Sequence, residues 1–390
     1  MNTFNPRRRK LLQYGFMGLG AFFGNALLPS PLKAASLSLS LAARGELLPP
    51  DQNGVRLPAG FTSRIVAHSG QTLFGYTWHA APDGGAVFAT ADGGWIYVSN
   101  SELDNQAGGV GALRFNAQGE IIDAYSILSQ TNRNCAGGHT PWQTWLSCEE
   151  IEKGKVWECD PFGRKAAQIR SALGFFKHEA VAVDTRNMQL YLTEDQSDGC
   201  LYRYTARSFD AAGNPNLEDG FLEVAEVVEG PIGTVRWHTL PDPLAITTPT
   251  RKQIANSTRF NGGEGIWYHQ GIVYFTTKGD DRVWAYTVRQ HHLSVVYNAA
   301  LYLRPVLTGV DNIITNAAGD LLVAEDGGDM QIVVLIAGKV LPLLQVASHD
   351  RSEITGPAFS PDGSRLYFSS QRGKTGLSEN GITFEITGPF

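Results

Sequence analysis

Residues 357–373 read PAFSPDGSRLYFSSQRG, and this stretch decides the fold. Apolar and polar residues alternate on both sides of Pro361-Asp362-Gly363, a pattern typical of two strands joined by a tight turn. A polar cluster follows the second strand. The segment therefore predicts a β-hairpin whose second strand ends in polar residues.

The same outline recurs along the chain as AVAVDTRNMQLYLTED (180–195), GIWYHQGIVYFTTKGDD (265–281) and NIITNAAGDLLVAEDGG (312–328), and more loosely as AVFATADGGWIYVSNSE (86–102) and TPWQTWLSCEE (140–150). Aligning the second strands gives one column of residues: Tyr97, Trp145, Tyr191, Tyr274, Leu322 and Tyr367. The steps between them are 48, 46, 83, 48 and 45 residues. A period of about 40–50 residues is the signature of β-propeller blades.

The 83-residue step is too short for two blades at this period. We interpret it as one blade with an excursion at about residues 207–259, a loop-like stretch rich in proline. Long apolar periods of 3.6 residues are missing from the sequence, so helices should be few. We therefore predict an all-β, six-bladed propeller that occupies residues 50–390 as a single domain, with seven blades as the alternative.

The composition agrees with a large β-domain and excludes some partners. Of the 390 residues, 43% are hydrophobic and 18% are charged, which is enough apolar material for one large core. The formal net charge is −6, and beyond residues 7–10 no basic patch or run of like charge suggests nucleic acid. We therefore expect no nucleic-acid partner. Four cysteines are too few for a disulfide framework, although they leave room for one bridge.

The N-terminus predicts export. Residues 7–10 read RRRK and precede Leu11-Leu12, which gives a twin-arginine pattern, and a mildly apolar stretch follows over residues 14–28. That stretch is short for a membrane span. We expect a signal peptide over residues 1–35, with cleavage near Ala35 or near Ala43, and the twin-arginine export machinery as a partner. The mature protein would then be periplasmic or secreted, with no stable membrane insertion.

The repeat also predicts where a site should lie, because equivalent positions in different blades form a ring around the central channel. Ten to twelve residues before the aligned column stand Cys135, Glu179, Glu264 and Asp311. Three to five residues after it stand Glu102, Glu149, Glu150, Glu194, Asp195, Glu325 and Asp326. Carboxylates gathered in a low-dielectric channel repel one another, and bound cations would resolve that conflict. Carboxylate oxygens suit calcium, and a thiolate among them indicates a transition metal.

Each of these residues also has an ordinary structural interpretation. An acidic residue after a strand is usually a solvated turn residue, and a single buried cysteine is often a small core residue. His178, beside Glu179, is more typical of a hydrogen-bonded core histidine than of a ligand. The shared blade position of Cys135, Glu179, Glu264 and Asp311 favours the metal site.

Several motifs resemble those of the PhoX-type alkaline phosphatases, from about residue 75 to residue 375. They are NCAGG (134–138), TPWQTWLSCEE (140–150), KHEA (177–180), EGIW (264–267) with VYFTTKGD (273–280), and the segment from Thr355 to Arg372. Members of that family are twin-arginine-exported propellers. The resemblance implies ferric iron (Fe3+) and calcium (Ca2+) at the channel and the hydrolysis of phosphate monoesters. It also implies that Cys135, Glu179 and Glu264 bind iron, and that Glu150, with Glu149 beside it, binds calcium or bridges two ions.

The chain departs from the family pattern at one position. Members of the family carry a phosphate-binding arginine two residues before the glutamate of the EGIW motif, and this chain has Gly262 there. The chain is also shorter than those enzymes. As phosphate contacts we predict Arg259, Lys177, Lys278 and His139.

The leading interpretation is a metal-dependent phosphoesterase acting on a small phosphorylated substrate, since no serine-nucleophile motif is visible. One alternative is a calcium-dependent lactonase or other ester hydrolase on the same fold. Another is a non-catalytic, ligand-binding propeller that keeps calcium for structure. A propeller fold alone does not choose among them.

Overall fold

The computed structural model describes Leu41 and residues 44–390. The predicted export signal at residues 1–35 and the alternative cleavage point at Ala43 lie outside the described residues. Within the described residues, the helical segments are short 3-10 turns and none is long and apolar enough to cross a membrane. These turns are η3 (Ser171–Leu173), η4 (Thr250–Lys252), η5 (Lys278–Asp280), η6 (Val288–Gln290), η7 (Ala299–Leu301) and η8 (Ser378–Asn380).

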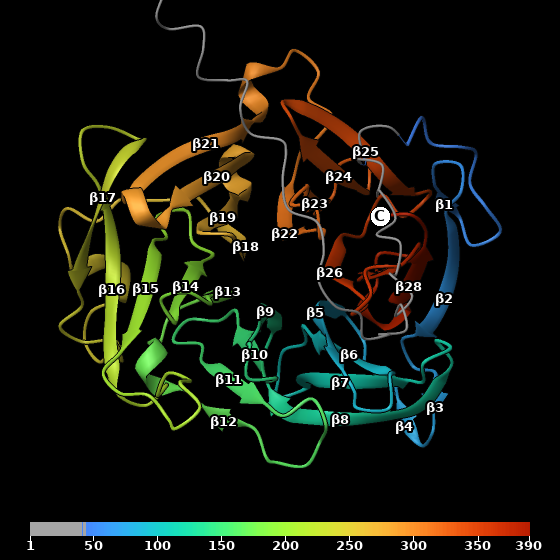
Figure 1. Cartoon of the computed structure of the whole chain (residues 1–390), viewed down its shortest axis with the longest axis horizontal. Helices are drawn as coiled ribbons and strands as arrows, with labels where there is room; N and C mark the ends of the chain where they lie inside the picture. The colour runs from blue at the N-terminus through green and yellow to red at the C-terminus, as the bar shows by residue number, and fades with distance from the viewer. Residues whose placement is uncertain (1–40, 42–43) are drawn as a thin grey trace, which may run out of the picture. The chain divides into compact units, whose positions relative to one another are not determined.

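The strands form antiparallel sheets around a central channel, which confirms the all-β propeller (Figure 1). One sheet contains β5 (Pro82–Ala89), β6 (Trp95–Ser101), β7 (Gly108–Phe115) and β8 (Ile121–Thr131). The next contains β9 (Asn134–His139), β10 (Trp145–Glu149), β11 (Val156–Cys159) and β12 (Gln168–Ile169). A separate hairpin pairs β3 (Thr72–Leu73) with β4 (Tyr76–Thr77).

Both ends of the described chain contribute to the last two sheets. One holds β22 (Val310–Thr315), β23 (Leu321–Glu325), β24 (Gln331–Ile336) and β25 (Lys339–Val346), with β1 (Val55–Arg56) at its edge. The other holds β26 (Ile354–Phe359), β27 (Arg365–Ser370) and β28 (Ile382–Thr387), completed by β2 (Thr62–His68). Pairing β2 with β28 joins early and late parts of the chain in one sheet.

A nine-stranded sheet fills the remaining part of the ring and contains two innermost strands, β13 and β18. In spatial order it runs β13 (His178–Asp184), β14 (Gln189–Glu194), β15 (Leu201–Ala206), β16 (Gly220–Val227), β17 (Gly233–Thr239), β21 (His292–Asn298), β20 (Arg282–Thr287), β19 (Ile272–Thr277) and β18 (Gly263–His269). The predicted excursion at residues 207–259 is thus not all loop. It contains β16 and β17, and β17 pairs with β21.

The repeated hairpins of the sequence are the inner halves of these sheets. The hairpins are β5–β6, β9–β10, β13–β14, β18–β19, β22–β23 and β26–β27. Every repeat segment supplies the second strand of its hairpin, and all except residues 140–150 also supply part of the innermost strand. The innermost strands contact one another in the order β5, β9, β13, β18, β22, β26 and back to β5, so that they close a ring around the channel.

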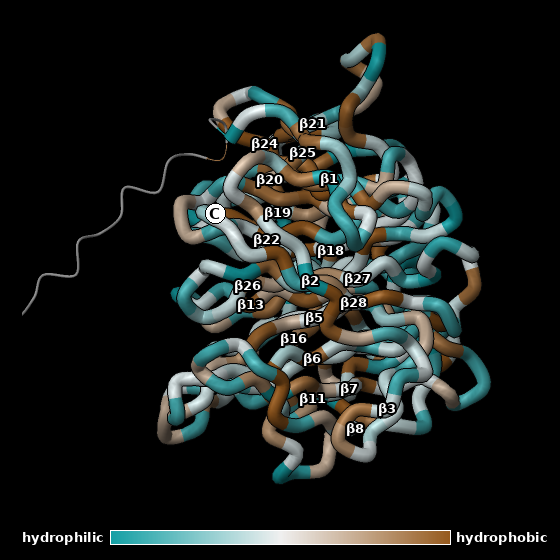
Figure 2. Tube along the Cα trace, turned by 90° about the vertical axis from the view of Figure 1, so that its right-hand side faces the viewer, coloured by the Kyte–Doolittle hydropathy of each residue, from teal (hydrophilic) through white to brown (hydrophobic). Residues whose placement is uncertain are grey.

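The aligned column of the sequence lies in the core between sheets. Tyr97, Tyr191, Leu322 and Tyr367 are fully buried, Trp145 is 2% exposed and Tyr274 is partly buried. The rings of Tyr97 and Tyr367 stack with centroids 5.1 Å apart and so link two neighbouring sheets. Burying an aromatic side chain contributes about 1.5–3 kcal/mol. Figure 2 shows the apolar segments mainly along the strands and the hydrophilic ones mainly in the loops.

Candidate metal centre

Every innermost strand has an irregularity near its first residues. The register between each innermost strand and its neighbour shifts there, for example between Pro82 and Gly85 of β5 and between Gly263 and Ile266 of β18. A β-bulge of this kind turns a side chain away from the regular alternation, and bulges are common beside functional sites. We call the polar side chains at these bulges the inner ring: Asp83, Cys135, Glu179, Glu264 and Asp311.

A second set of side chains surrounds the inner ring. Each of these residues follows directly after the last residue of the second strand of its hairpin, and we call them the rim ring: Glu102, Glu150, Asp195, Lys278, Asp326 and Gln371. The amide of Gln371 donates to Asp83 at 2.5 Å and to Glu102 at 2.9 Å. Lys278 Nζ lies 2.9 Å from Glu264 Oε1 and 3.1 Å from Asp326 Oδ2. The repeat therefore brings two positions per hairpin into contact at one end of the channel.

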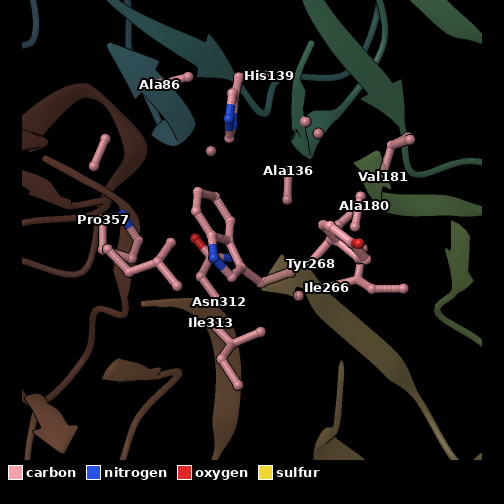
Figure 3. Close-up of a pocket in the computed structure, with 18 of the residues that line it drawn as sticks. Ala86, Ala136, His139, Ala180, Val181, Ile266, Tyr268, Asn312, Ile313 and Pro357 are labelled. Atoms are coloured by element: carbon pink, nitrogen blue, oxygen red, sulfur yellow. The ribbon is translucent and has the colours of Figure 1, made fainter. Parts of the chain in front are cut away.

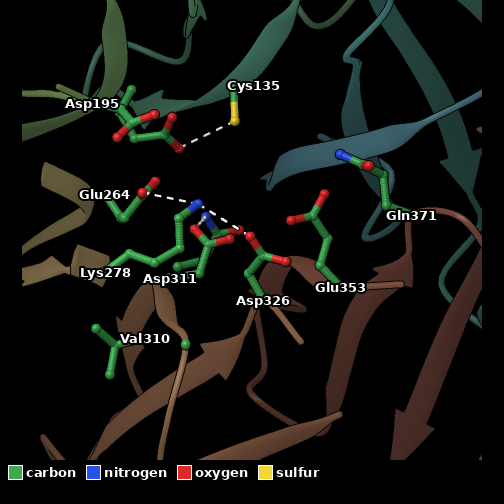
Figure 4. Close-up of polar contacts among 12 residues, drawn as sticks. Cys135, Asp195, Glu264, Lys278, Val310, Asp311, Asp326, Glu353 and Gln371 are labelled. Atoms are coloured by element: carbon green, nitrogen blue, oxygen red, sulfur yellow. Dashed lines mark hydrogen bonds and ion pairs between the residues drawn. The ribbon is translucent and has the colours of Figure 1, made fainter. Parts of the chain in front are cut away.

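Together the two rings and Glu353 form a continuous acidic cluster (Figure 4). Its members fall into four overlapping groups whose candidate ligand atoms lie within 4.8 Å of one another: Asp83, Glu102 and Cys135; Cys135, Glu150 and Glu179; Glu179, Glu264 and Asp311; Asp311, Asp326 and Glu353. Cys135 Sγ lies 3.3 Å from Glu179 Oε1 and 3.8 Å from Asp83 Oδ2. Each group is a candidate cation site, and two of them share the thiol.

The electrostatics of the cluster favour protonated acids as long as no cation is bound. Burial, followed by repulsion from Glu102, raises the pKa of Glu150 to about 8. Burial likewise raises the pKa of Asp311 to about 7, with Asp326 adding to the shift. The pKa of Glu179 is raised well above its usual range, first by burial and then by Glu264. Burial and the carboxylates of Asp83 and Glu179 also raise the pKa of the Cys135 thiol.

Four basic side chains border the acids. Lys177 Nζ lies 2.8 Å from Glu150 and 2.6 Å from Asp195, and Lys278 bridges Glu264 and Asp326 as described above. The Arg133 guanidinium lies 2.5 Å from Glu102 and 3.1 Å from Glu150. Arg372 donates to Glu353 at 2.9 Å. These side chains are 22% to 38% exposed, so they lie where the cluster meets solvent.

The structure places most of the sequence-predicted acids at this cluster, and Asp195 joins it through Lys177. Glu149 and Glu325 lie outside the four groups. Glu149 accepts backbone N–H bonds from Asn132 at 3.1 Å and Lys155 at 3.2 Å. Glu325 accepts them from Thr308 at 3.1 Å and Gln331 at 3.0 Å. Both carboxylates hold loops in place.

Two of the four predicted phosphate contacts lie elsewhere. The Arg259 guanidinium donates to Cys200 Sγ at 3.0 Å and to the backbone carbonyl of Arg251. His139 is the last residue of β9, whereas Cys135 is near its start. At about 3.3 Å per residue, the two are about 13 Å apart along the strand. Of the four predicted phosphate contacts, Lys177 and Lys278 border the acids.

Sequence reasoning missed two acids, Asp83 and Glu353. Each lies fourteen residues before its column residue, Tyr97 or Tyr367, and so fell outside the ten-to-twelve window used for the other blades. The signal was present in the sequence, since an acid stands at the same unusual distance in both hairpins.

The glycine that departs from the family motif is held by its surroundings. Gly262 has φ +67°, a left-handed conformation that side chains rarely adopt. A Cβ built there would lie 3.3 Å from Asp195 Oδ1, so position 262 faces the acidic cluster. Lys278 N donates to the Gly262 carbonyl oxygen at 2.8 Å. Gly262 is therefore paired through its backbone with Lys278, whose side chain contacts Glu264.

The donor set fits cations. Within the described residues, Glu179 Oε2 is fully buried and has no hydrogen-bond partner, an arrangement that costs free energy unless a cation or proton fills it. Two groups have only oxygen donors and suit a hard ion such as calcium: Glu179, Glu264 and Asp311, and Asp311, Asp326 and Glu353. The two groups that include Cys135 offer a thiolate as well, which suits a transition metal.

Comparison with protein families gives one match. The chain matches the family model described as alkaline phosphatase PhoX over residues 78–158 and 152–294. The first range contains Cys135 and Glu150, and the second contains Glu179 and Glu264. A search of curated proteins found no sequence match.

Comparison with solved structures shows which proteins share the fold. Pseudomonas fluorescens PhoX in complex with vanadate, a transition-state analogue, superposes with a TM-score of 0.72 at 17% identity, covering 88% of this chain and 98% of that chain. XC5397 from Xanthomonas campestris, a gluconolactonase, gives a TM-score of 0.50 at 13% identity, covering 89% of this chain and 98% of that one. At these identities the likeness concerns the fold.

Proposed function

This chain belongs to the family of PhoX alkaline phosphatases, and on that premise we propose that it is an exported, metal-dependent phosphoesterase that hydrolyses phosphate monoesters. The observation that carries the proposal is the Cys135 thiol set among carboxylates, 3.3 Å from Glu179. A lactonase with one hard cation would not need this thiol. We also propose that the propeller has six blades, with the nine-stranded sheet, which contains two innermost strands, counted as two of them.

The proposed ligands are divided by donor type. Cys135, Glu179 and Glu264 would hold Fe3+, and the oxygen-only group of Asp311, Asp326 and Glu353 would hold Ca2+. Asp83, Glu102 and Glu150 complete the remaining groups and would serve either ion. Cations bound there would supply Lewis-acid chemistry, drawing electron density from the phosphoryl oxygens and activating the attacking oxygen.

The chain's own cations would orient the substrate. Arg133, Lys177, Lys278 and Arg372 border the cluster at its solvent side. Charge-assisted hydrogen bonds from such groups fix phosphoryl oxygens and offset the negative charge that develops during transfer. Arg133 and Lys177 stand two residues before Cys135 and Glu179, the position that Gly262 occupies relative to Glu264. They supply in neighbouring blades the positive charge that is missing at Gly262.

Location and partners complete the proposal. The twin-arginine pattern of residues 7–12 supports export through the twin-arginine machinery to the periplasm or beyond. A small phosphorylated substrate is the proposed partner, and no basic surface run supports nucleic acid.

The test measures metal and activity in one protein purified from its native export route. Elemental analysis should find iron and calcium, and the protein should absorb visible light through a thiolate-to-iron charge-transfer band. Cys135→Ser should abolish the band and lower aryl-phosphate hydrolysis by at least about tenfold. Cys148→Ser is the matched control, since Cys148 is buried in the core of the next strand. Calcium without iron, with lactone hydrolysis that survives Cys135→Ser, would favour the lactonase.

A further inference from the structure

The opposite end of the channel holds a cavity that the phosphoesterase chemistry does not use. It has a volume of about 440 Å³ and is lined by the innermost strands beyond the inner ring. Cavities of about 300–1,000 Å³ accommodate small molecules. Figure 3 shows His139 and Ala86 on one side of the cavity and Asn312 and Ile313 on the other.

Small residues separate this cavity from the acids. Gly84, Ala136, Ala180 and Gly265 directly follow inner-ring residues in their strands. A Cβ on Gly84 would lie 2.5 Å from Ala136 Cα, and one on Gly265 would lie 2.6 Å from Asn312 Cα. The strands approach so closely that no side chain fits between them. The cavity and the acidic cluster therefore occupy different lengths of the channel.

The lining indicates the charge of a ligand. No aspartate, glutamate, lysine or arginine is among the residues that line the cavity, and its walls include Val87, Val181, Ile266 and Phe359. Burying an ionised group without a charged partner is costly. A ligand of this cavity is therefore uncharged and mostly apolar.

Two side chains indicate the shape of that ligand. The rings of His139 and Trp267 lie with centroids 5.1 Å apart and planes tilted by 40°. Trp267 Nε1 donates to Thr315 Oγ1 at 3.0 Å, which fixes the orientation of the indole. In the described part of the chain, neither ring nitrogen of His139 has a hydrogen-bond partner. Desolvation lowers the pKa of His139, so the neutral ring offers one donor and one acceptor.

We propose that this cavity is a second binding site, which takes one neutral, flat, ring-containing small molecule. Trp267 supplies the stacking surface and His139 the orienting hydrogen bond. Each innermost strand is at the end of its sheet, and β13 and β18 are the two ends of the nine-stranded sheet. The outer edge of each innermost strand faces the channel, so its unpaired backbone N–H and C=O groups can also bind a ligand there.

The test uses two fluorescent probes with the same aromatic frame on the purified full chain. N-phenyl-1-naphthylamine is neutral and carries an N–H donor, whereas 8-anilinonaphthalene-1-sulfonate adds a negative charge. The neutral probe should bind saturably at one site per chain. The sulfonate should bind at least about tenfold more weakly, because its charge would be buried without a partner.

Variants assign the binding to the cavity. Trp267→Leu should lower the binding affinity of the neutral probe by about tenfold, because the aromatic contact is lost. His139→Leu should weaken it by a similar or smaller factor, and this second variant keeps the test valid if Trp267→Leu fails to fold. Leu303→Ser is the matched control, because Leu303 is 99% exposed in a loop outside the channel. It should leave binding unchanged.

Three results would overturn the proposal. The first is no saturable binding of the neutral probe, and the second is binding that Leu303→Ser removes. The third is binding that neither Trp267→Leu nor His139→Leu weakens in folded protein. Metal content should stay the same in every variant, so the result does not depend on whether the chain is a phosphoesterase.

Discussion

Glu149 and Glu150 are neighbours in the sequence and lie in different surroundings. Glu149 ends β10 and accepts two backbone N–H bonds, whereas Glu150 lies in the acidic cluster with Cys135 and Glu179. Glu325 and Asp326 repeat this arrangement at the end of β23. Successive side chains of a strand point to opposite sides, so one acid of each pair faces the loop and the other faces the channel.

The comparison teaches how to separate a structural acid from a candidate ligand. Both oxygens of Glu325 accept backbone N–H bonds, one from Thr308 before β22 and one from Gln331 at the start of β24, so a cation would have to displace those bonds. Glu194, the third acid at such a strand end, is likewise held by Tyr202, Arg251 and the backbone of Cys200. By contrast, Glu179 keeps an oxygen without a partner. Hydrogen-bond satisfaction distinguishes the two kinds of acid, and residue type does not.

The largest effect should come from the inner ring. Glu179→Ala and Glu264→Ala should each lose bound transition metal and lower phosphatase activity by more than about a hundredfold, because each removes a proposed ligand. Metal analysis and kcat/KM on an aryl phosphate measure both. Glu325→Ala should unfold at a lower temperature while keeping its metal. If both inner-ring variants keep full metal content, the assignment of these acids fails.

Removal of the metals should make the free energy of unfolding depend on pH, because the carboxylates of the cluster then repel one another. Burial raises the pKa of Glu150 to about 8 from its usual 4.5, so the folded, metal-free state holds more protons than the unfolded state between these values. Its free energy of unfolding should therefore fall as pH rises from about 4.5 to 8. Asp311, with a pKa of about 7, acts in the same direction.

Chelated protein in denaturant titrations at several pH values gives the measurement. Glu150→Gln should flatten part of the slope, and the metal-loaded protein should show little slope in this window. A chelated wild type whose stability rises between pH 5 and pH 8 would contradict the picture of unpaired carboxylates.

The fold could be predicted from the sequence because its periodic signals are local. The alternation around turns such as Pro361-Asp362-Gly363 and the spacing of the aligned column both reflect hairpins that the structure contains. Four of the five inner-ring residues were predicted for the same reason, and Asp83 was missed. The sequence could not predict which acid of the pairs Glu149-Glu150 and Glu325-Asp326 lies in the cluster and which accepts backbone hydrogen bonds. That difference depends on where each strand ends and on which backbone N–H groups lie nearby.

The remaining errors come from tertiary contacts. Arg259 is near Glu264 in sequence, yet its guanidinium turns to Cys200 and Arg251. His139 follows Cys135 closely, yet an extended strand carries it to the far end of the channel. An extended strand places residues that are only a few positions apart in sequence far apart in space, and the spacing of a motif does not reveal that distance.

A smaller effect should separate the two members of one pair directly. Glu325→Gln replaces a charged acceptor of two backbone N–H groups and should lower the free energy of unfolding by about 1.5–3 kcal/mol with metal content unchanged. Asp326→Asn should reduce calcium content instead, with little loss of stability in the metal-free protein. Denaturant unfolding and metal analysis of the two variants provide the measurement. Equal changes in the free energy of unfolding and in calcium content would contradict the distinction between loop-facing and channel-facing acids.

The smallest effect concerns Gly262, the repeat position at which two other blades carry the basic residues Arg133 and Lys177. Its φ of +67° means that any side chain there costs about 1–2 kcal/mol of stability. Gly262→Ala carries this backbone cost alone, whereas Gly262→Arg adds a cation near Asp195. If the cluster binds phosphate, Gly262→Arg should exceed Gly262→Ala in kcat/KM for an aryl phosphate by about tenfold, the value of one charge-assisted contact. Melting curves should show similar stability for the two variants, so that the difference reports charge. Equal kcat/KM in two folded, metal-loaded variants would mean that substrate approaches from the side of Arg133 and Lys177, whose cations already border Glu150.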